Sequence, residues 1–355
     1  MCGLGADGPR GLFLGHFVAW AKLLDAAGLC VSDRSWSVSL YFVLRCGGRG
    51  FGHSSGRGIH LLPILMKRFA IYLVSLLAAI GALALLVDYV NVCLVRASTG
   101  NSAYKMERLY TNPEPDEIAI VGSSRAQNNF VPSIISQRCF DYGVSAMGVR
   151  EIISILEVLQ KRRTDASIIL NFDPSGAFGK RSVVADYRLV PQSGKVSLED
   201  RIPGVRFFGA LRKNLVNMMN ARKSVSFVVD NGAQLIKTIR TAEEWKVIEK
   251  GLEVRGFVGD SDVERRLVEV LGSFSPRIVY FVICPCSRGW MDKFRGQKDL
   301  DVFLSRLDDV PNVRILNYFG SQKFSNSDFT DPTHFNLGGA RKFSELIRLQ
   351  ILTPK

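Results

Sequence analysis

Three polar residues in the C-terminal part of the chain have the types and order needed for a hydrolytic triad. Beyond residue 96 the sequence contains one histidine, His334, with Asp331 three residues before it. Ser124 follows an apolar run that ends at Gly122. A serine hydroxyl becomes a good nucleophile when an imidazole takes its proton and an aspartate orients that imidazole. Each pattern is weak alone, because such serine turns occur in plain loops and His334 could simply cap the following helix.

Alternating strands and helices are expected to position these residues. Apolar runs predict strands at Ile118–Val121, Cys139–Tyr142, Ser167–Phe172, Arg277–Cys284 and Val313–Tyr318. Helical periodicity falls at Val149–Gln160, Val263–Leu271, Leu300–Leu307 and Leu337–Leu352. Strands separated by helices pair in parallel through right-handed crossovers, so we predict a three-layer α/β/α fold with a parallel sheet of about five strands. Ser124 then lies at the C-terminal edge of the sheet, where ligands bind in such folds.

Residues from about 175 to 260 fit this alternation poorly. They contain helical runs at Phe207–Met219 and Ala233–Lys250 among basic loops. We expect an insertion over the C-terminal edge of the sheet, which either shapes a substrate site or forms an inert helical cover.

An apolar segment precedes the predicted domain. Phe69–Val87 contains no charged residue and is long enough to cross a bilayer, so residues 66–95 are predicted to be a transmembrane signal anchor. Lys67 and Arg68 just before it favour a cytoplasmic N-terminus and a C-terminal domain outside the membrane. A cleavable signal peptide, with Ala82–Ala84 as its cleavage site, and a buried core helix are the competing interpretations. Residues 96–116 read as a spacer and residues 117–355 as the α/β domain.

Residues 1–65 differ in composition from the rest of the chain. They hold twelve of the 32 glycines and three of the four histidines but no glutamate. Met66-Lys67-Arg68 followed by the apolar run is typical of the start of a bacterial membrane-anchored protein. We therefore expect translation to begin at Met66, and an N-terminal peptide starting at Met1 in the native protein would contradict this.

The overall charge and the cysteines narrow the possible partners and cofactors. The 355 residues carry a formal net charge of +13, yet no stretch interleaves aromatic with basic residues, so nucleic acid is not expected as a partner. A solvated basic surface is the simplest explanation, ahead of attraction to an anionic membrane or polymer. Cys284-Pro285-Cys286 is not a Cys-x-x-Cys pair, and the domain offers one histidine, so we predict neither a metal site nor a cofactor.

The order of these motifs resembles the SGNH/GDSL hydrolase superfamily, in particular its membrane-anchored bacterial branch related to extracytoplasmic acyl-transfer proteins. Gly122-Ser123-Ser124 matches the first block of that family, Asp141-Tyr142-Gly143 the second, and Asp331 with His334 the fifth. The resemblance implies a flavodoxin-like fold in which Ser124 is the nucleophile, His334 the base and Asp331 its orienting residue. It also implies an oxyanion hole formed by the backbone N–H groups of Ser124 and Gly143.

The chain departs from the family pattern on the oxyanion side. Ser123 replaces the usual aspartate, and the third block falls on Asn171–Pro174, which places Asp173 where the family has an oxyanion-hole asparagine. An ionised aspartate accepts hydrogen bonds and cannot donate one to an oxyanion. Asn171, Asn128 and Asn129 are the possible substitutes. Arg125 could bind an anionic substrate group, although we expect it to point to solvent.

Together these patterns predict a serine esterase or O-acyltransferase, tethered to the bacterial inner membrane through residues 69–87. The resemblance implies an extracytoplasmic substrate, an acylated carbohydrate or cell-envelope polymer. A catalytically inactive SGNH-like protein that binds a glycan or an envelope-assembly partner is the alternative. The aspartate at position 173 favours that alternative, whereas Ser124, Asp331 and His334 together favour the enzyme.

Overall fold

The computed structural model of the chain describes residues 61–111, 114–162, 164–175, 178, 185–207 and 227–352. The chain divides into two units, Met1–Met66 and Lys67–Lys355, and the account below concerns the second. The leader expected at residues 1–65 and the helix expected at Phe207–Met219 lie almost entirely outside the described residues.

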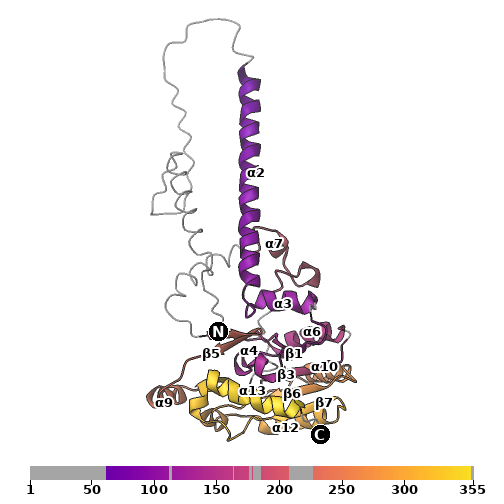
Figure 1. The fold of residues 1–355 in the computed structure, drawn as a ribbon, viewed down its shortest axis with the longest axis vertical. Coiled ribbons are helices and arrows are strands. Elements are labelled where there is room, and N and C mark those ends of the chain that lie inside the picture. Colours follow the sequence, from indigo (N-terminus) through magenta and orange to yellow (C-terminus); the bar gives the residue numbers. More distant parts are fainter. Residues whose placement is uncertain are drawn as a thin grey trace, which may run out of the picture. The chain divides into compact units, whose positions relative to one another are not determined.

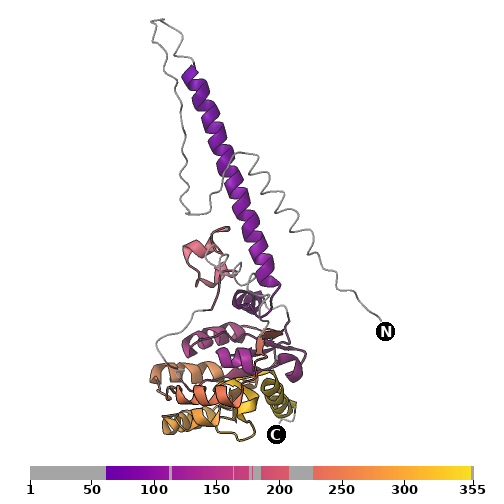
Figure 2. The same cartoon turned by 90° about the vertical axis from the view of Figure 1, so that its left-hand side faces the viewer.

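The predicted anchor lies within one long helix, α2 (Leu61–Arg96). The part from Met66 to Arg96 is long and apolar enough to cross a membrane. Leucine and alanine dominate it, and both are strong helix formers. The expected spacer contains a further helix, α3 (Ser102–Thr111), which packs against the domain through a buried face that includes Lys105 and Met106. Figures 1 and 2 show α2 leading through α3 into the α/β part of the chain.

Five parallel strands form the central sheet, as the sequence predicts. They are β1 (Ile118–Val121), β2 (Cys139–Asp141), β3 (Ile168–Asn171), β6 (Val279–Ile283) and β7 (Val313–Asn317). Their order is β2-β1-β3-β6-β7, with β1 pairing to β2 on one side and to β3 on the other. All four pairings are parallel, so the ends of β1, β3 and β6 meet at one edge. The protein is therefore an α/β protein with a parallel sheet.

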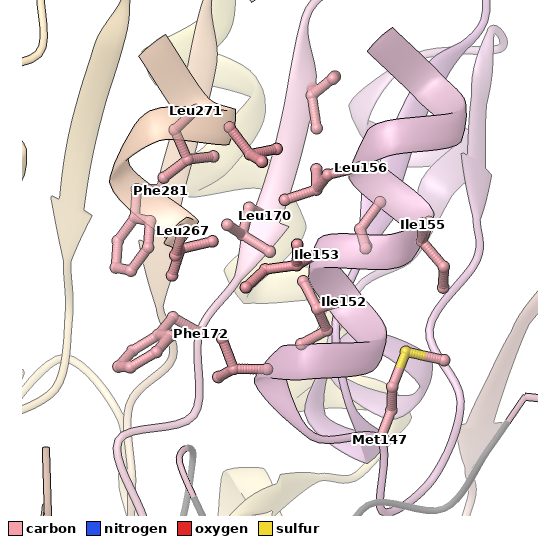
Figure 3. Close-up of a cluster of buried hydrophobic side chains, with 14 of the residues drawn as sticks. Met147, Ile152, Ile153, Ile155, Leu156, Leu170, Phe172, Leu267, Leu271 and Phe281 are labelled. Carbon is pink, nitrogen blue, oxygen red and sulfur yellow. The ribbon is translucent and has the colours of Figure 1, made fainter. Parts of the chain in front are cut away.

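Both faces of the sheet are buried against helices. One apolar cluster joins the sheet to α6 (Val149–Gln160), α10 (Ser261–Gly272) and α12 (Gln297–Asp308). Figure 3 shows its centre, where Leu156 of α6 and Leu267 of α10 lie beside Leu170 of β3. The other cluster joins the opposite face to α4 (Ser124–Asn129), α5 (Pro132–Ile135) and α13 (Leu337–Leu352). Each fully buried aliphatic side chain stabilises such a core by about 1.5–3 kcal/mol.

Short elements complete the described part of the domain. They are the 3-10 turns η1 (Pro191–Ser193) and η2 (Asn326–Asp328), helices α7 (Leu198–Arg201), α9 (Ala242–Lys250) and α11 (Arg288–Met291), and strands β4 (Phe227–Asp230), β5 (Ala233–Ile236), β8 (Phe329–Asp331) and β9 (His334–Phe335).

The helix expected at Ala233–Lys250 is wrong in its first part. Ala233–Ile236 is strand β5, which pairs antiparallel with β4 through the turn residues Asn231 and Gly232. Both turn residues have positive φ, 41° and 92°, as a tight two-residue hairpin turn requires. The Asn231 carbonyl accepts a 2.8 Å hydrogen bond from the Asp141 N–H, so the hairpin lies beside the edge strand β2. Only α9 is helical, and a Thr241–Glu244 capping box begins it.

Candidate active site

Ser124 is the first residue of α4 and follows β1 after a two-residue turn. Gly122 makes this turn possible, because a Cβ there would come within 2.7 Å of the Asn171 carbonyl oxygen on the neighbouring strand β3. The close approach seats the start of α4 directly on the C-terminal edge of the sheet. The side chain of Ser124 therefore stands where the sequence predicts it.

The structure brings the three predicted triad residues together. His334 Nε2 lies 2.8 Å from Ser124 Oγ, and His334 Nδ1 lies 2.8 Å from Asp331 Oδ2. An ionised carboxylate can only accept, so Nδ1 carries the proton of the neutral ring and Nε2 is left to accept the Ser124 hydroxyl proton. This is the tautomer that a general base needs.

Asp331 is held in its ionised, orienting state by several donors. Its Oδ1 accepts the backbone N–H groups of Thr333 at 2.9 Å and His334 at 3.0 Å. Burial would raise the pKa of Asp331, but the hydrogen bonds and charge of His334 and these N–H groups outweigh it and lower the pKa to about 2. Asp331 therefore remains a carboxylate across the neutral range.

A small hairpin presents His334, and Asn129 ties it to α4. Strands β8 and β9 pair antiparallel, with Asp331 directly opposite His334. Asn129 Nδ2 donates to the Thr333 carbonyl at 3.1 Å, and Asn129 Oδ1 accepts the Phe335 N–H at 2.9 Å. Asn129, named above as a possible oxyanion donor, therefore links the nucleophile helix to the histidine hairpin. The cap of α13 is Asn336, whose Oδ1 accepts the Gly339 N–H, so His334 is free of that role.

The second predicted oxyanion donor is already engaged. The Gly143 N–H donates to Asp141 Oδ1 at 2.6 Å, and Lys105 Nζ of α3 donates to the Gly143 carbonyl at 2.6 Å. Both charged side chains are fully buried. Burial raises the pKa of Asp141 to about 6, against the opposing effects of Lys105 and the Gly143 N–H. Burial likewise lowers the pKa of Lys105.

Asp173, the third predicted member of the oxyanion side, is also paired. Its Oδ1 lies 3.2 Å from Arg125 Nη2 and accepts the Ser175 N–H at 2.9 Å. The expectation that Arg125 points to solvent is wrong: its side chain is 1% exposed and its guanidinium stacks 5.3 Å from the centre of the Trp290 ring. Asp173 and the aromatic face compensate the burial of this charge only in part, because Arg125 Nε and Nη1 have no hydrogen-bond partner among the described residues.

The remaining asparagine substitutes differ in their contacts. Asn171 Nδ2 donates to Cys284 Sγ at 3.1 Å and to the Val282 carbonyl at 3.4 Å, below the surface of the site. Among the described residues, no hydrogen bond of the Asn128 side chain is found. Cys284 and Cys286 are both buried free thiols. Burial raises the pKa of each, that of Cys286 to about 11, so neither is a ready nucleophile.

Comparison with known proteins places the chain in no family. No protein-family model matches it, and no curated protein matches it. Its chemistry must therefore be inferred from the site.

The arrangement contains the three groups that acyl transfer through a serine nucleophile uses. Ser124 supplies a nucleophile, His334 a base and acid, and Asp331 a counter-charge for the imidazolium. Within the described residues, no three His, Cys, Asp or Glu side chains come together as a possible metal site. Among the groups predicted to stabilise an oxyanion, the Gly143 N–H and Asp173 are engaged with other partners, whereas the groups that would move the proton are hydrogen-bonded to one another.

Proposed function

We propose that the protein is a serine esterase or O-acyltransferase of the SGNH/GDSL type. The observation that supports this most strongly is the hydrogen-bonded chain Ser124–His334–Asp331, with both links at 2.8 Å. The parallel sheet, with the serine directly after β1 and the histidine just before the last helix, is consistent with the three-layer, flavodoxin-like architecture of that superfamily.

In this proposal Ser124 Oγ attacks an acyl carbonyl while its proton passes to His334 Nε2. The imidazolium, stabilised by Asp331, then protonates the departing alcohol, and an acyl group remains on Ser124. Water or an acceptor alcohol next gives its proton to His334 and attacks the acyl group, which regenerates the serine. Water makes the protein an esterase, and a sugar hydroxyl makes it a transferase.

The proposed oxyanion hole relies first on the backbone N–H of Ser124, at the start of α4. The Gly143 N–H can contribute only if it leaves Asp141, its present acceptor. Asp173 contributes no donor, and its negative charge is paired with Arg125. Since one oxyanion donor is worth roughly two to three powers of ten in rate, we expect a slow enzyme.

We further propose that α2 anchors the protein in the bacterial inner membrane with the domain outside. Lys67 and Arg68 support this orientation, because basic residues accumulate on the cytoplasmic side of a span. An extracytoplasmic domain would meet cell-envelope polymers, so an acylated carbohydrate or envelope polymer is the proposed substrate.

Ester hydrolysis by the purified full chain tests the proposal. Wild type should hydrolyse an activated aryl acetate, and Ser124→Ala should reduce the rate to background. Ser123→Ala is the matched control, because Ser123 Oγ is buried and has no hydrogen-bond partner among the described residues. A Ser124→Ala variant that hydrolyses the ester like wild type would refute the proposal.

A binding protein with the same fold is the second candidate. The engaged Gly143 N–H and the Arg125–Asp173 ion pair favour it, because both occupy groups on the oxyanion side. A folded wild type that hydrolyses no ester but retains acylated envelope glycans, equally well in Ser124→Ala, would support this candidate over the enzyme.

A further inference from the structure

Three aliphatic side chains that lie close together in sequence, on the segment around α7, are exposed. Leu198, Ile202 and Val205 are 76%, 46% and 47% exposed. Backbone hydrogen bonds from Ile202 N–H to the Glu199 carbonyl and from Val205 N–H to the Ile202 carbonyl keep the segment tightly turned. The three residues lie within one segment of eight residues, and we call them the α7 patch. Single exposed aliphatic residues are ordinary, but a cluster calls for a partner.

The segment that carries the α7 patch is fastened to α2. Arg206 Nε and Nη2 donate to the two carboxylate oxygens of Asp88 at 2.9 and 2.7 Å. Phe207 is buried in one cluster with Val92 and Val95 of α2. Figures 1 and 2 both show α7 beside α2.

Gly204 also contacts α2, one helical turn before Asp88. A Cβ at Gly204 would lie 2.8 Å from the Ala84 Cβ, and its φ of 87° is one that glycine adopts freely. One turn corresponds to about 5–6 Å along the helix axis. Asp88 is the first charged residue after the uncharged run Phe69–Val87, so Ala84 belongs to the last turn of the apolar stretch. The segment therefore reaches the level at which that stretch ends.

The surface of α2 near this level is apolar as well. Leu83, Leu85 and Leu86 are each more than half exposed in the protein alone. The segment that carries the α7 patch is therefore fastened to α2 at a level where a bilayer would cover apolar side chains.

We propose that the α7 patch inserts into the outer interface of the same bilayer that α2 spans. Its ligand is the boundary between lipid headgroups and acyl chains, into which an amphipathic segment buries its apolar side. Together with α2 it gives the domain a second point of attachment, which limits how far the active site can tilt from the membrane surface. The inference depends on the membrane-anchor part of the proposed function and is independent of the triad.

Fluorescence quenching of the full chain in lipid nanodiscs tests this. Leu198→Trp places a reporter on the patch, Leu77→Trp places one in the middle of the apolar run, and Val302→Trp places one at an exposed site on α12 that is 57% exposed. The signal of the unsubstituted parent, which has four tryptophans, is subtracted from each. We expect lipids brominated near the glycerol end to quench Leu198→Trp, lipids brominated deep in the chain to quench Leu77→Trp, and neither to quench Val302→Trp.

The experiment distinguishes failure of the membrane anchor from failure of the proposed insertion of the α7 patch. If Leu77→Trp is quenched and Leu198→Trp is quenched no more than Val302→Trp, the patch lies outside the bilayer and the inference is wrong. If Leu77→Trp is not quenched either, the anchor itself is wrong. The tryptophan of Leu198→Trp could instead be shielded from water, without being quenched by lipid, only in discs that hold two chains. That result would identify a second copy as the occupant of the patch and would also overturn the inference.

Discussion

The two sides of the candidate site differ in the hydrogen-bond partners of their polar groups. We call Ser124, His334 and Asp331 the base side, and Gly143, Asp141, Asp173 and Arg125 the oxyanion side. On the base side, each hydrogen bond points along the route of the proton, from Ser124 through His334 to Asp331. On the oxyanion side, the polar groups are paired with one another, Gly143 with Asp141 and Asp173 with Arg125, but Arg125 Nε and Nη1 and Asp141 Oδ2 have no hydrogen-bond partner among the described residues. In the proposed mechanism the groups for proton transfer are therefore already in place, whereas stabilisation of an oxyanion requires a rearrangement or depends on the Ser124 N–H.

This difference teaches that a complete triad does not by itself define an active hydrolase. The base side resists change because Asn129 binds the histidine hairpin to α4. The oxyanion side is tied instead to α3, whose Lys105 donates to the Gly143 carbonyl. Because α3 follows directly after α2, the position of Gly143 is linked to the helix that leads from the predicted anchor.

The largest effect should come from breaking the base side at Asp331. Asp331→Asn can still accept the Thr333 and His334 N–H groups but favours the wrong tautomer of His334, so we expect ester hydrolysis to fall about 10⁴-fold. Steady-state kinetics on folded protein measure this. Thr333→Val, which removes the long contacts of Thr333 Oγ1 to Asp331 at 3.2 Å and to His334 Nδ1 at 3.3 Å, should cost less than about tenfold. Hydrolysis by Asp331→Asn at nearly the wild-type rate would contradict the role assigned to Asp331.

On the oxyanion side, the buried carboxyl of Asp141 should make the free energy of unfolding depend on pH. The folded-state pKa of Asp141 is raised from 3.8 to about 6, so protonation favours the fold. Its contribution is full below pH 4 and is lost as the pH rises through 6, a change of about 3 kcal/mol for two pKa units. Asp141→Asn should lack this loss in chemical denaturation at pH 4 and pH 7.

The exposed Asp116 provides the matched control for that experiment. Asp116→Asn should follow the wild-type change with pH. If wild type and Asp141→Asn lose the same stability between pH 4 and pH 7, burial does not raise the pKa of Asp141 in the folded protein.

The smallest of these effects should come from loosening the link between nucleophile helix and hairpin. Asn129→Ala leaves the buried Phe335 N–H without its acceptor, which should lower the free energy of unfolding by about 2 kcal/mol. Asn128→Ala, on the same helix, should lower it by clearly less. Thermal denaturation compares the two variants. Equal losses would mean that Asn129 contributes no more than its neighbour.

The sequence predicts the sheet and the base side well because their signals are local. The bounds of β1, α6 and α13 agree with prediction at both ends, since apolar runs and helical periodicity mark them. Parallel pairing then places Ser124 at the correct edge of the sheet. The hairpin at Phe227–Ile236 could also have been predicted, because Asn231-Gly232 is a strong turn signal. The helical interpretation of Ala233–Lys250 overlooked it.

The environment of Arg125 could not be predicted because its contacts join distant parts of the chain. Arg125 is buried only because Asp173, after β3, and Trp290, on α11, meet its guanidinium. The Gly143 N–H, in contrast, is occupied by a local contact, because Asp141 two residues before it accepts its hydrogen bond. Aspartate commonly forms such turns, so this bond was open to prediction from the sequence.

Mapping the site of a covalent adduct tests the central claim most directly. The full chain is treated with a fluorophosphonate, which reacts with serine hydroxyls that a neighbouring base has activated, and its peptides are analysed by mass spectrometry. The account predicts one dominant adduct, on Ser124, that is lost in Asp331→Asn and kept in Ser123→Ala. A folded protein that forms no adduct, or forms it on a serine other than Ser124, would contradict the account.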